Sequence, residues 1–93
     1  MLYPYATFPG YLIVTFSQVI QDSEVEGGEK VLVNFEQPDD EIGFKEARYS
    51  LPDMKMLYSD GFLPKEKQQN EEILSRNAKL IMKYAKQGGV ELA

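Results

Sequence analysis

Residues 11–35, YLIVTFSQVI QDSEVEGGEK VLVNF, carry the clearest secondary-structure pattern of the chain. Apolar residues recur at every second position near both ends of this stretch, which is typical of strands with one buried face. Between them, Gly27-Gly28 favours a two-residue hairpin turn, because both turn positions need a positive φ. That turn would place Ile20 opposite Phe35 on the buried face. The stretch therefore predicts two antiparallel strands joined by a tight turn.

Three further segments extend this pair of strands into a sheet. Residues 2–8 contain Pro4, which cannot donate to a ladder, so we expect them to form an edge strand or an extended arm. Residues 44–51 and 54–58 also alternate, although Lys45 does not fit the pattern, and turn residues separate the two segments. Together the segments predict a small antiparallel meander of four to five strands.

Residues 64–87 change to a helical pattern. Pro64 suits a first helical position, and Gly88-Gly89 follows the last one. At 100° per residue the helix has an apolar arc and, opposite to it, a basic arc that we name the basic helix face. The apolar arc consists of Ile73, Leu74, Asn77, Ala78, Leu80, Ile81, Tyr84 and Ala85, and the basic helix face of Arg76, Lys79, Lys83 and Lys86. Residues 65–72 carry no large apolar side chain, so we expect these turns beyond the core or along its edge.

The 93 residues predict a single domain, 1–93, in which 1–61 form the sheet, 64–87 the helix and 88–93 a tail. The fold class is α+β: a small antiparallel β-meander with one long C-terminal helix packed on one face. With 43% hydrophobic residues, the chain is too apolar for a disordered tail. It shows neither a long apolar run nor a basic leader with an apolar stretch, so we expect a cytoplasmic protein.

The chain contains no histidine and no cysteine. This composition excludes serine–histidine–carboxylate and cysteine–histidine catalytic sites, and zinc sites built from thiolates and imidazoles. Neither a P-loop nor a Gly-x-Gly-x-x-Gly run occurs. The run Asp22-x-Glu24-x-Glu26-Gly27 is similar to the opening of a calcium loop, but its twelfth position is Val33 instead of an acid. We therefore predict a protein without enzymatic activity, cofactor or metal site.

The formal net charge is −5, and the charges are unevenly distributed. Residues 1–44 hold eight acids and one base, whereas residues 45–93 hold nine bases and seven acids. The acids of two expected turns form what we name the acidic surface: Asp22, Glu24, Glu26, Glu29, Asp39, Asp40 and Glu41. Two interpretations are open. These side chains are either solvated turn residues, or they steer a basic protein, such as a nuclease or a toxin, toward this surface.

The basic helix face also allows two interpretations. Its cations are either solvent-exposed and stabilised by the helix dipole near the C-terminal end, or they contact phosphates or an acidic partner. The net charge of −5 disfavours direct binding of nucleic acid, because affinity for the phosphate backbone depends mainly on charge neutralisation.

Three tyrosines, Tyr3, Tyr5 and Tyr11, cluster near the N-terminus. One helix covers only one face of the predicted sheet, so the second face stays uncovered. Tyrosines on the uncovered face would mark an interface, for example that of a homodimer. Alternatively, the tyrosines pack on one another across the strands. Asn77, inside the apolar arc, is expected to form a hydrogen bond with backbone at the sheet edge.

Residues 31–78 contain Leu51-Pro52-Asp53, then Ser59-Asp60-Gly61, and then a helix with Glu66 and Asn77-Ala78. In this order they resemble the N-terminal module of HicB-type antitoxins. The chain departs from that family's pattern by an extra hairpin and by the lack of a Glu-Ala pair early in the helix. The resemblance implies an antitoxin-like module that binds a protein acting on nucleic acid.

The whole chain also resembles short uncharacterised proteins of Gram-positive bacteria and their mobile elements. That similarity rests on Leu2-Tyr3-Pro4-Tyr5, Phe35-Glu36, Asn77-Ala78-Lys79-Leu80-Ile81, Tyr84-Ala85 and Gly88-Gly89, and it implies no function. The first functional hypothesis is a non-enzymatic interaction module, antitoxin-like or inhibitor-like, that binds a nucleic-acid-handling protein through the acidic surface. The alternatives are a small accessory protein that contacts nucleic acid through the basic helix face, and a small protein of another function.

Overall fold

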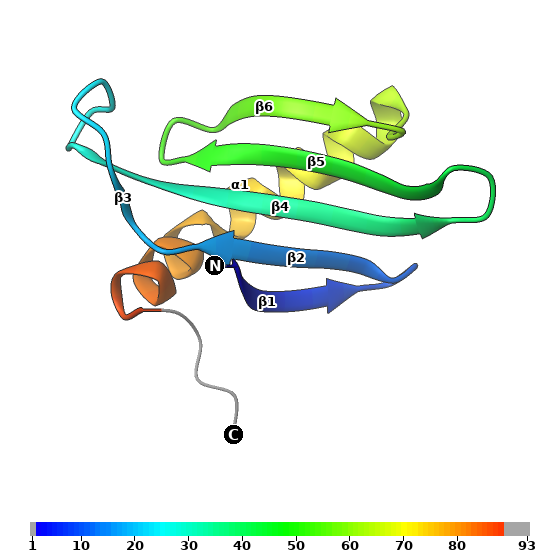
Figure 1. Cartoon of the computed structure of the whole chain (residues 1–93), viewed down its shortest axis with the longest axis horizontal. Helices are drawn as coiled ribbons and strands as arrows, with labels where there is room; N and C mark the ends of the chain where they lie inside the picture. The colour runs from blue at the N-terminus through cyan, green and yellow to red at the C-terminus, as the bar shows by residue number, and fades with distance from the viewer. Residues whose placement is uncertain (1, 89–93) are drawn as a thin grey trace.

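The computed structural model describes residues 2–88, which form one antiparallel sheet and one helix (Figure 1). The strands are β1 (Leu2–Phe8), β2 (Leu12–Ser17), β3 (Ile20–Gln21), β4 (Glu29–Asp39), β5 (Gly43–Leu51) and β6 (Lys55–Asp60), and the helix is α1 (Pro64–Lys86). The predicted α+β class, a meander with a C-terminal helix, is confirmed. Of the predicted tail 88–93, all residues except Gly88 lie outside the described part of the chain.

The sheet has the strand order β1-β2-β4-β5-β6, and each neighbouring pair is antiparallel. The short β3 pairs only with the beginning of β4. Figure 1 shows α1 crossing behind the sheet, from the end of β6 to the side of β1 and β2. One face of the sheet is therefore covered by α1 and the other is open, and β1 and β6 are its two edges. Within residues 2–88, no helix has the length and apolar character needed to cross a membrane.

The core lies between the covered face and α1. Phe16, Phe35 and Tyr49, from three neighbouring strands, are fully buried in one cluster with Leu74 and Ile81 of the helix. Burying one side chain of this size stabilises the fold by about 1.5–3 kcal/mol. The alternation of apolar residues in the strands and their helical spacing in α1 thus fix the position of the helix on the sheet.

The predicted two-residue turn at Gly27-Gly28 is wrong. Both glycines have positive φ, +85° and +73°, as a turn requires, but the loop comprises residues 22–28. As a result, Ile20 lies opposite Lys30 and not opposite Phe35. The apolar side chains of β2 and β4 still share the covered face, because Val14 lies opposite Phe35 and Phe16 opposite Val33.

Asp22 explains why the loop is longer. Its backbone N–H donates to the carbonyl oxygen of Gly28 at 2.9 Å, which closes the loop between these two residues. Its carboxylate accepts hydrogen bonds from the Glu24 N–H at 3.0 Å and from the Lys30 ammonium at 2.8 Å. An aspartate that caps its own turn competes with the glycine pair for the position of the turn.

The first turns of α1 are fixed to the sheet by polar contacts. Glu66 accepts a hydrogen bond from the Leu63 N–H at 2.9 Å and forms an ion pair with Lys45 of β5 at 2.8 Å. Asn70 is only 2% exposed, so the expectation that residues 65–72 run beyond the core or along its edge is wrong for this residue. Lys45 does not fit the apolar alternation of β5 because it points to the covered side and holds the helix start.

The buried arc of α1 is narrower than predicted. Asn70, Leu74, Ile81 and Ala85 are its buried residues, and at 100° per residue they span about 60°. Leu80 lies about 120° from Leu74 and is 41% exposed, so its assignment to the buried side is wrong.

Candidate binding groove

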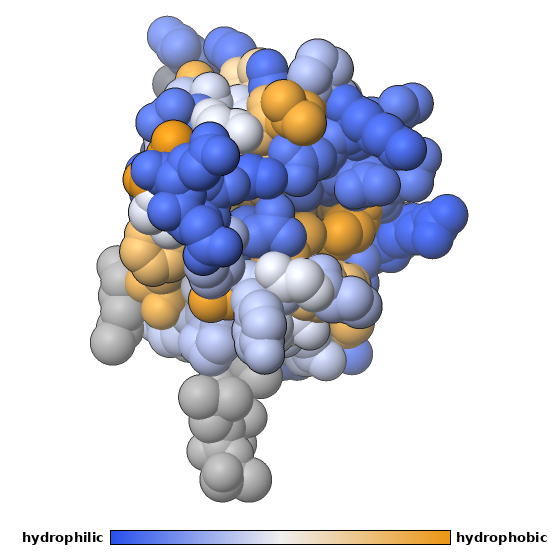
Figure 2. All heavy atoms as spheres, turned by 90° about the vertical axis from the view of Figure 1, so that its right-hand side faces the viewer, coloured by the Kyte–Doolittle hydropathy of each residue, from blue (hydrophilic) through white to orange (hydrophobic). Residues whose placement is uncertain are grey.

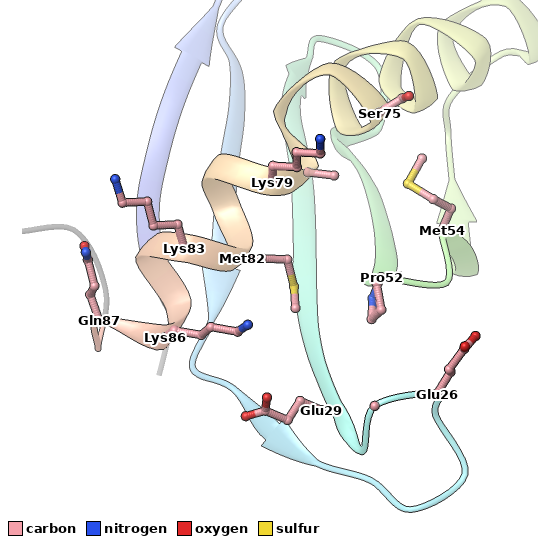
Figure 3. Close-up of a pocket in the computed structure, with 12 residues that line it drawn as sticks. Glu26, Glu29, Pro52, Met54, Ser75, Lys79, Met82, Lys83, Lys86 and Gln87 are labelled. Carbon is pink, nitrogen blue, oxygen red and sulfur yellow. The ribbon is translucent and has the colours of Figure 1, made fainter.

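An open groove of about 880 Å³ lies beside the C-terminal half of α1 (Figure 3). The helix forms one wall. The 22–28 loop with the start of β4 and the turn between β5 and β6 form the other boundaries. Three segments that are distant in sequence therefore meet at one place, and the core packing of α1 positions them.

The floor of the groove is apolar. Ala78 and Met82 contribute from α1, and Pro52 and Met54 contribute from the β5–β6 turn. Figure 3 shows Met54 extending from its turn toward the helix. Methionine is flexible and polarisable, and it adapts to apolar side chains of different shape.

The backbone at Met54 has a φ of +59°, in the left-handed region that non-glycine residues seldom adopt. This conformation is unfavourable for a residue with a Cβ by about 1–2 kcal/mol, so the surrounding turn must hold it. Unfavourable backbone conformations of this kind concentrate at ligand-binding positions. Because Met54 remains 37% exposed, its position at the groove leaves apolar area free for a ligand.

The two rims of the groove carry opposite charges. Lys79, Lys83 and Lys86 lie along the helix rim, and Glu26 and Glu29 lie on the loop side (Figure 3). Among residues 2–88, none of these five side chains forms an ion pair within 4.0 Å. The charges of both rims therefore remain available to a bound molecule, above an apolar floor that lowers the local dielectric.

The basic helix face and part of the acidic surface thus belong to the same site. Three of the four cations of the basic helix face line the groove, whereas Arg76 is exposed outside it. From the acidic surface, Glu26 and Glu29 line the groove, and Glu24 lies in a smaller pocket beside it.

Asp22 has a structural role next to the groove. The ammonium of Lys30 donates to its carboxylate, which holds the pKa of Asp22 below its ordinary value and raises the pKa of Lys30. Asp22 therefore serves the loop that presents Glu26 and Glu29 to the groove.

The remaining acids of the acidic surface lie elsewhere. Asp39 ends β4, and Asp40 and Glu41 lie in the turn that leads to β5, at the opposite end of β4 from the groove. Because β4 has 11 residues, the two acidic groups are separated by about 33 Å. Figure 2 views the end of the molecule that carries this turn, where most side chains are hydrophilic and apolar groups are interspersed among them.

Asp39 also acts locally. Its carboxylate accepts hydrogen bonds from the backbone N–H groups of Ile42 at 3.1 Å and Glu41 at 2.9 Å, which lower its pKa. The structure therefore divides the acidic surface into a groove part and a distant turn.

Two of the three tyrosines pack against the core, and Tyr11 lies apart from them. Tyr3 lies against Phe16 with ring centroids 5.7 Å apart, and Tyr5 donates to the side-chain oxygen of Asn77 at 2.5 Å, so both pack on the covered side. Asn77 donates to the carbonyl of Ile73, within the helix and not at a sheet edge as predicted. Tyr11 is 76% exposed in the β1–β2 turn.

Sequence reasoning missed the apolar floor. Pro52 and Met54 looked like the end of one strand and the start of the next, and nothing in their local pattern places them opposite Met82. A weak signal was present, because Pro52 and Met54 are apolar residues in a turn, where a small sheet cannot bury them. Within residues 2–88, no group of three or more acidic side chains gathers as a metal site would require.

Comparisons of the chain with protein-family models, with curated proteins and with solved structures gave no match.

Proposed function

We propose that this protein is a non-enzymatic interaction module that holds an amphipathic segment of a partner protein in the groove. One observation carries the proposal: the groove combines an apolar floor with two oppositely charged rims whose side chains are not paired with one another within 4.0 Å. A fitting segment places apolar side chains on Met54 and Met82, basic side chains toward Glu26 and Glu29, and acidic side chains toward the helix lysines.

The floor and the rims of the groove would contribute differently to binding. Apolar side chains that fill a desolvated floor supply most of the affinity, at about 25 cal/mol per Å² of apolar area removed from water. Exposed rim charges contribute only about 0.2–1 kcal/mol each, but they select the partner and speed up association. An amphipathic helix in a groove is a common way to combine both contributions.

The proposed partner class is a nucleic-acid-handling protein, as in an antitoxin or an inhibitor. The resemblance to HicB-type antitoxins supports this class, and Pro52, from its Leu51-Pro52-Asp53 motif, lines the groove. Proteins that bind nucleic acid carry basic segments, and such a segment would meet Glu26 and Glu29. The acidic group at the β4–β5 turn would then act at a distance, by steering alone.

The second candidate function is direct contact with nucleic acid through the basic helix face. Lys79, Lys83 and Lys86 on one helix rim favour it. Glu26 and Glu29 across the groove weaken it, because their charges oppose those of a phosphate backbone approaching the same site.

Binding of designed peptides tests the proposal. Three fluorescent amphipathic helical peptides share one leucine stripe, and their flanks carry only lysine, only glutamate, or lysine on one side and glutamate on the other. We expect the mixed-flank peptide to bind about fivefold more tightly than either uniform peptide, from two or more favourable rim contacts. Labelled duplex DNA and single-stranded RNA, titrated over a range of salt concentrations, probe the second candidate.

Two variants locate the binding site. Met54→Ser should weaken binding of the mixed-flank peptide, whereas Met56→Ser should not, because Met56 is similarly exposed but lies outside the groove lining. Lys79→Glu together with Lys83→Glu should move the preference to the all-lysine peptide. Equal binding of the three peptides, or equal effects of the two methionine variants, would show the proposal to be wrong. Salt-dependent DNA or RNA binding that is lost in the double lysine variant would favour the second candidate.

A further inference from the structure

The two edges of the sheet differ in how well they are protected. β1 carries Pro4, which has no N–H to donate, and its pairing with β2 shifts register between Pro4 and Ala6. A proline in an edge strand discourages the addition of a further strand. At the other edge β6 has no proline and no further strand beside it, although the first turn of α1 lies near its end in Figure 1.

β6 also exposes apolar side chains. Met56 is 43%, Leu57 45% and Tyr58 38% exposed, in one continuous run of the edge strand. An edge strand presents backbone N–H and C=O groups that have no strand partner. Apolar side chains beside such groups favour pairing with another strand over solvation.

The charges at the two ends of β6 are complementary to each other. Lys55 begins the strand and Asp60 ends it, and both are exposed. Asp60 lies directly opposite Glu46 of β5, so two like charges face each other across the ladder. Such a pair is destabilising unless a cation lies nearby. Within residues 2–88, Asp60 forms no ion pair within 4.0 Å.

The register shift in the pairing of β6 with β5 allows two β6 strands to pair symmetrically. Lys55 pairs with Ser50 and Asp60 with Glu46, and both of these β5 residues belong to the open face. Met56, opposite Tyr49, belongs to the covered face, as does Ser59 opposite Ala47. Without the register shift near Tyr49, residues an odd number of positions apart, such as 55 and 60, would point to opposite faces.

We propose that β6 pairs antiparallel with β6 of a second copy of this chain and forms a two-fold symmetric dimer. Lys55 of each copy then lies opposite Asp60 of the other, Met56 opposite Ser59, and Leu57 opposite Tyr58. Lys55 and Asp60 share the open face of the sheet, and Met56 and Ser59 share the covered face. Each Lys55 offers Asp60 of the other copy an ion pair, which Asp60 does not form among residues 2–88 of its own copy.

The dimer joins the two sheets into one, with both helices on the same side. Because of the two-fold symmetry each contact occurs twice, so both ends of β6 take part in the pairing. A six-residue strand buries less than the roughly 1,600 Å² of a standard interface, so the dimer is weak and depends on concentration and salt. The proposal does not depend on the function proposed for the groove.

Sedimentation velocity over a concentration series tests the dimer. The wild-type protein should change from monomer to dimer with concentration. Lys55→Glu alone and Asp60→Lys alone should each weaken the dimer at least about fivefold, because symmetry places two like-charge contacts at the junction. An equimolar mixture of the two variants should regain dimer, since Glu at position 55 of one chain then faces Lys at position 60 of the other.

Arg76→Glu is the matched control, because it changes the net charge as much as Lys55→Glu but lies on the outer side of α1. It should leave the dimer unchanged, and far-ultraviolet circular dichroism checks that each variant is folded. A wild-type protein that stays monomeric at every concentration overturns the proposal. A dimer that resists both single charge reversals, or a mixture that does not regain dimer, also overturns it, because another surface must then be responsible.

Discussion

Replacing each of two leucines of α1 by alanine tests the packing of the helix most directly. Leu74 is fully buried in the core, and Leu80, six residues later on the same helix, is 41% exposed. Both changes remove the same atoms and make the same small gain in helix propensity. A difference in stability between the two variants therefore reports burial alone.

The expected magnitudes follow from burial. Leu74→Ala loses the transfer free energy of its side chain and leaves a cavity, which costs about 3–5 kcal/mol. Leu80→Ala loses only the buried part of its side chain, about 1 kcal/mol, and water fills the space. For a domain of this size, 1 kcal/mol corresponds to about 4–8 °C in Tm. Leu80→Ala should therefore lower Tm by about 4–8 °C, and Leu74→Ala by at least about 12 °C.

Thermal unfolding followed by circular dichroism, together with urea titration at fixed temperature, measures both values. The slope of the urea titration should be the same for the two variants if both unfold from the same compact state. Equal losses of stability would refute the helix register described above. A larger loss in Leu80→Ala would mean that the outer side of α1 is buried.

Three further outcomes are expected. Tyr5→Phe should cost about 1–3 kcal/mol in urea unfolding, because it leaves the Asn77 side-chain oxygen unpaired, whereas Tyr11→Phe should stay within about 0.5 kcal/mol. Hydrogen bonds hold the pKa of Glu66 below its ordinary value of 4.5, so its contribution to stability is present above that pH and is lost as the pH falls through the folded-state pKa. Tm should therefore depend less on pH below about 4.5 in Glu66→Gln than in the wild type. Gly28→Ala, at a φ of +73° with open space around the Cβ, should cost about 1–2 kcal/mol by thermal unfolding, and an unchanged Tm would contradict the described loop.

Much of the architecture could be predicted because it follows from local patterns. Apolar residues at every second position indicate strands in residues 12–16 and 31–35. Apolar residues at helical spacing indicate the helix between Pro64 and Gly88. Neither pattern needs information on tertiary contacts. The loop at 22–28 could not be predicted from the glycine pair, since the contacts of Asp22 with groups several residues away set its closure.

The groove depends on contacts that the sequence pattern does not contain. Lys79 and Lys83 were recognisable as one side of a helix, and Glu26 and Glu29 as acids of a turn, but their position on one groove depends on where α1 crosses the sheet. Likewise, the sequence grouped Asp39 and Glu26 in a single acidic surface because they are close along the chain. The extended strand β4 lies between them, so the two residues are far apart in space.

The order of the elements along the chain affects how each molecule is made. All strands of the covered face precede α1, so Phe16, Phe35 and Tyr49 leave the ribosome before the helix that shields them. During that interval the nascent sheet presents its apolar side to neighbouring nascent chains, which is the condition under which aggregation starts. The helix ends this exposure when it packs on the sheet, so we expect a slower emergence of residues 64–86 to increase aggregation during synthesis.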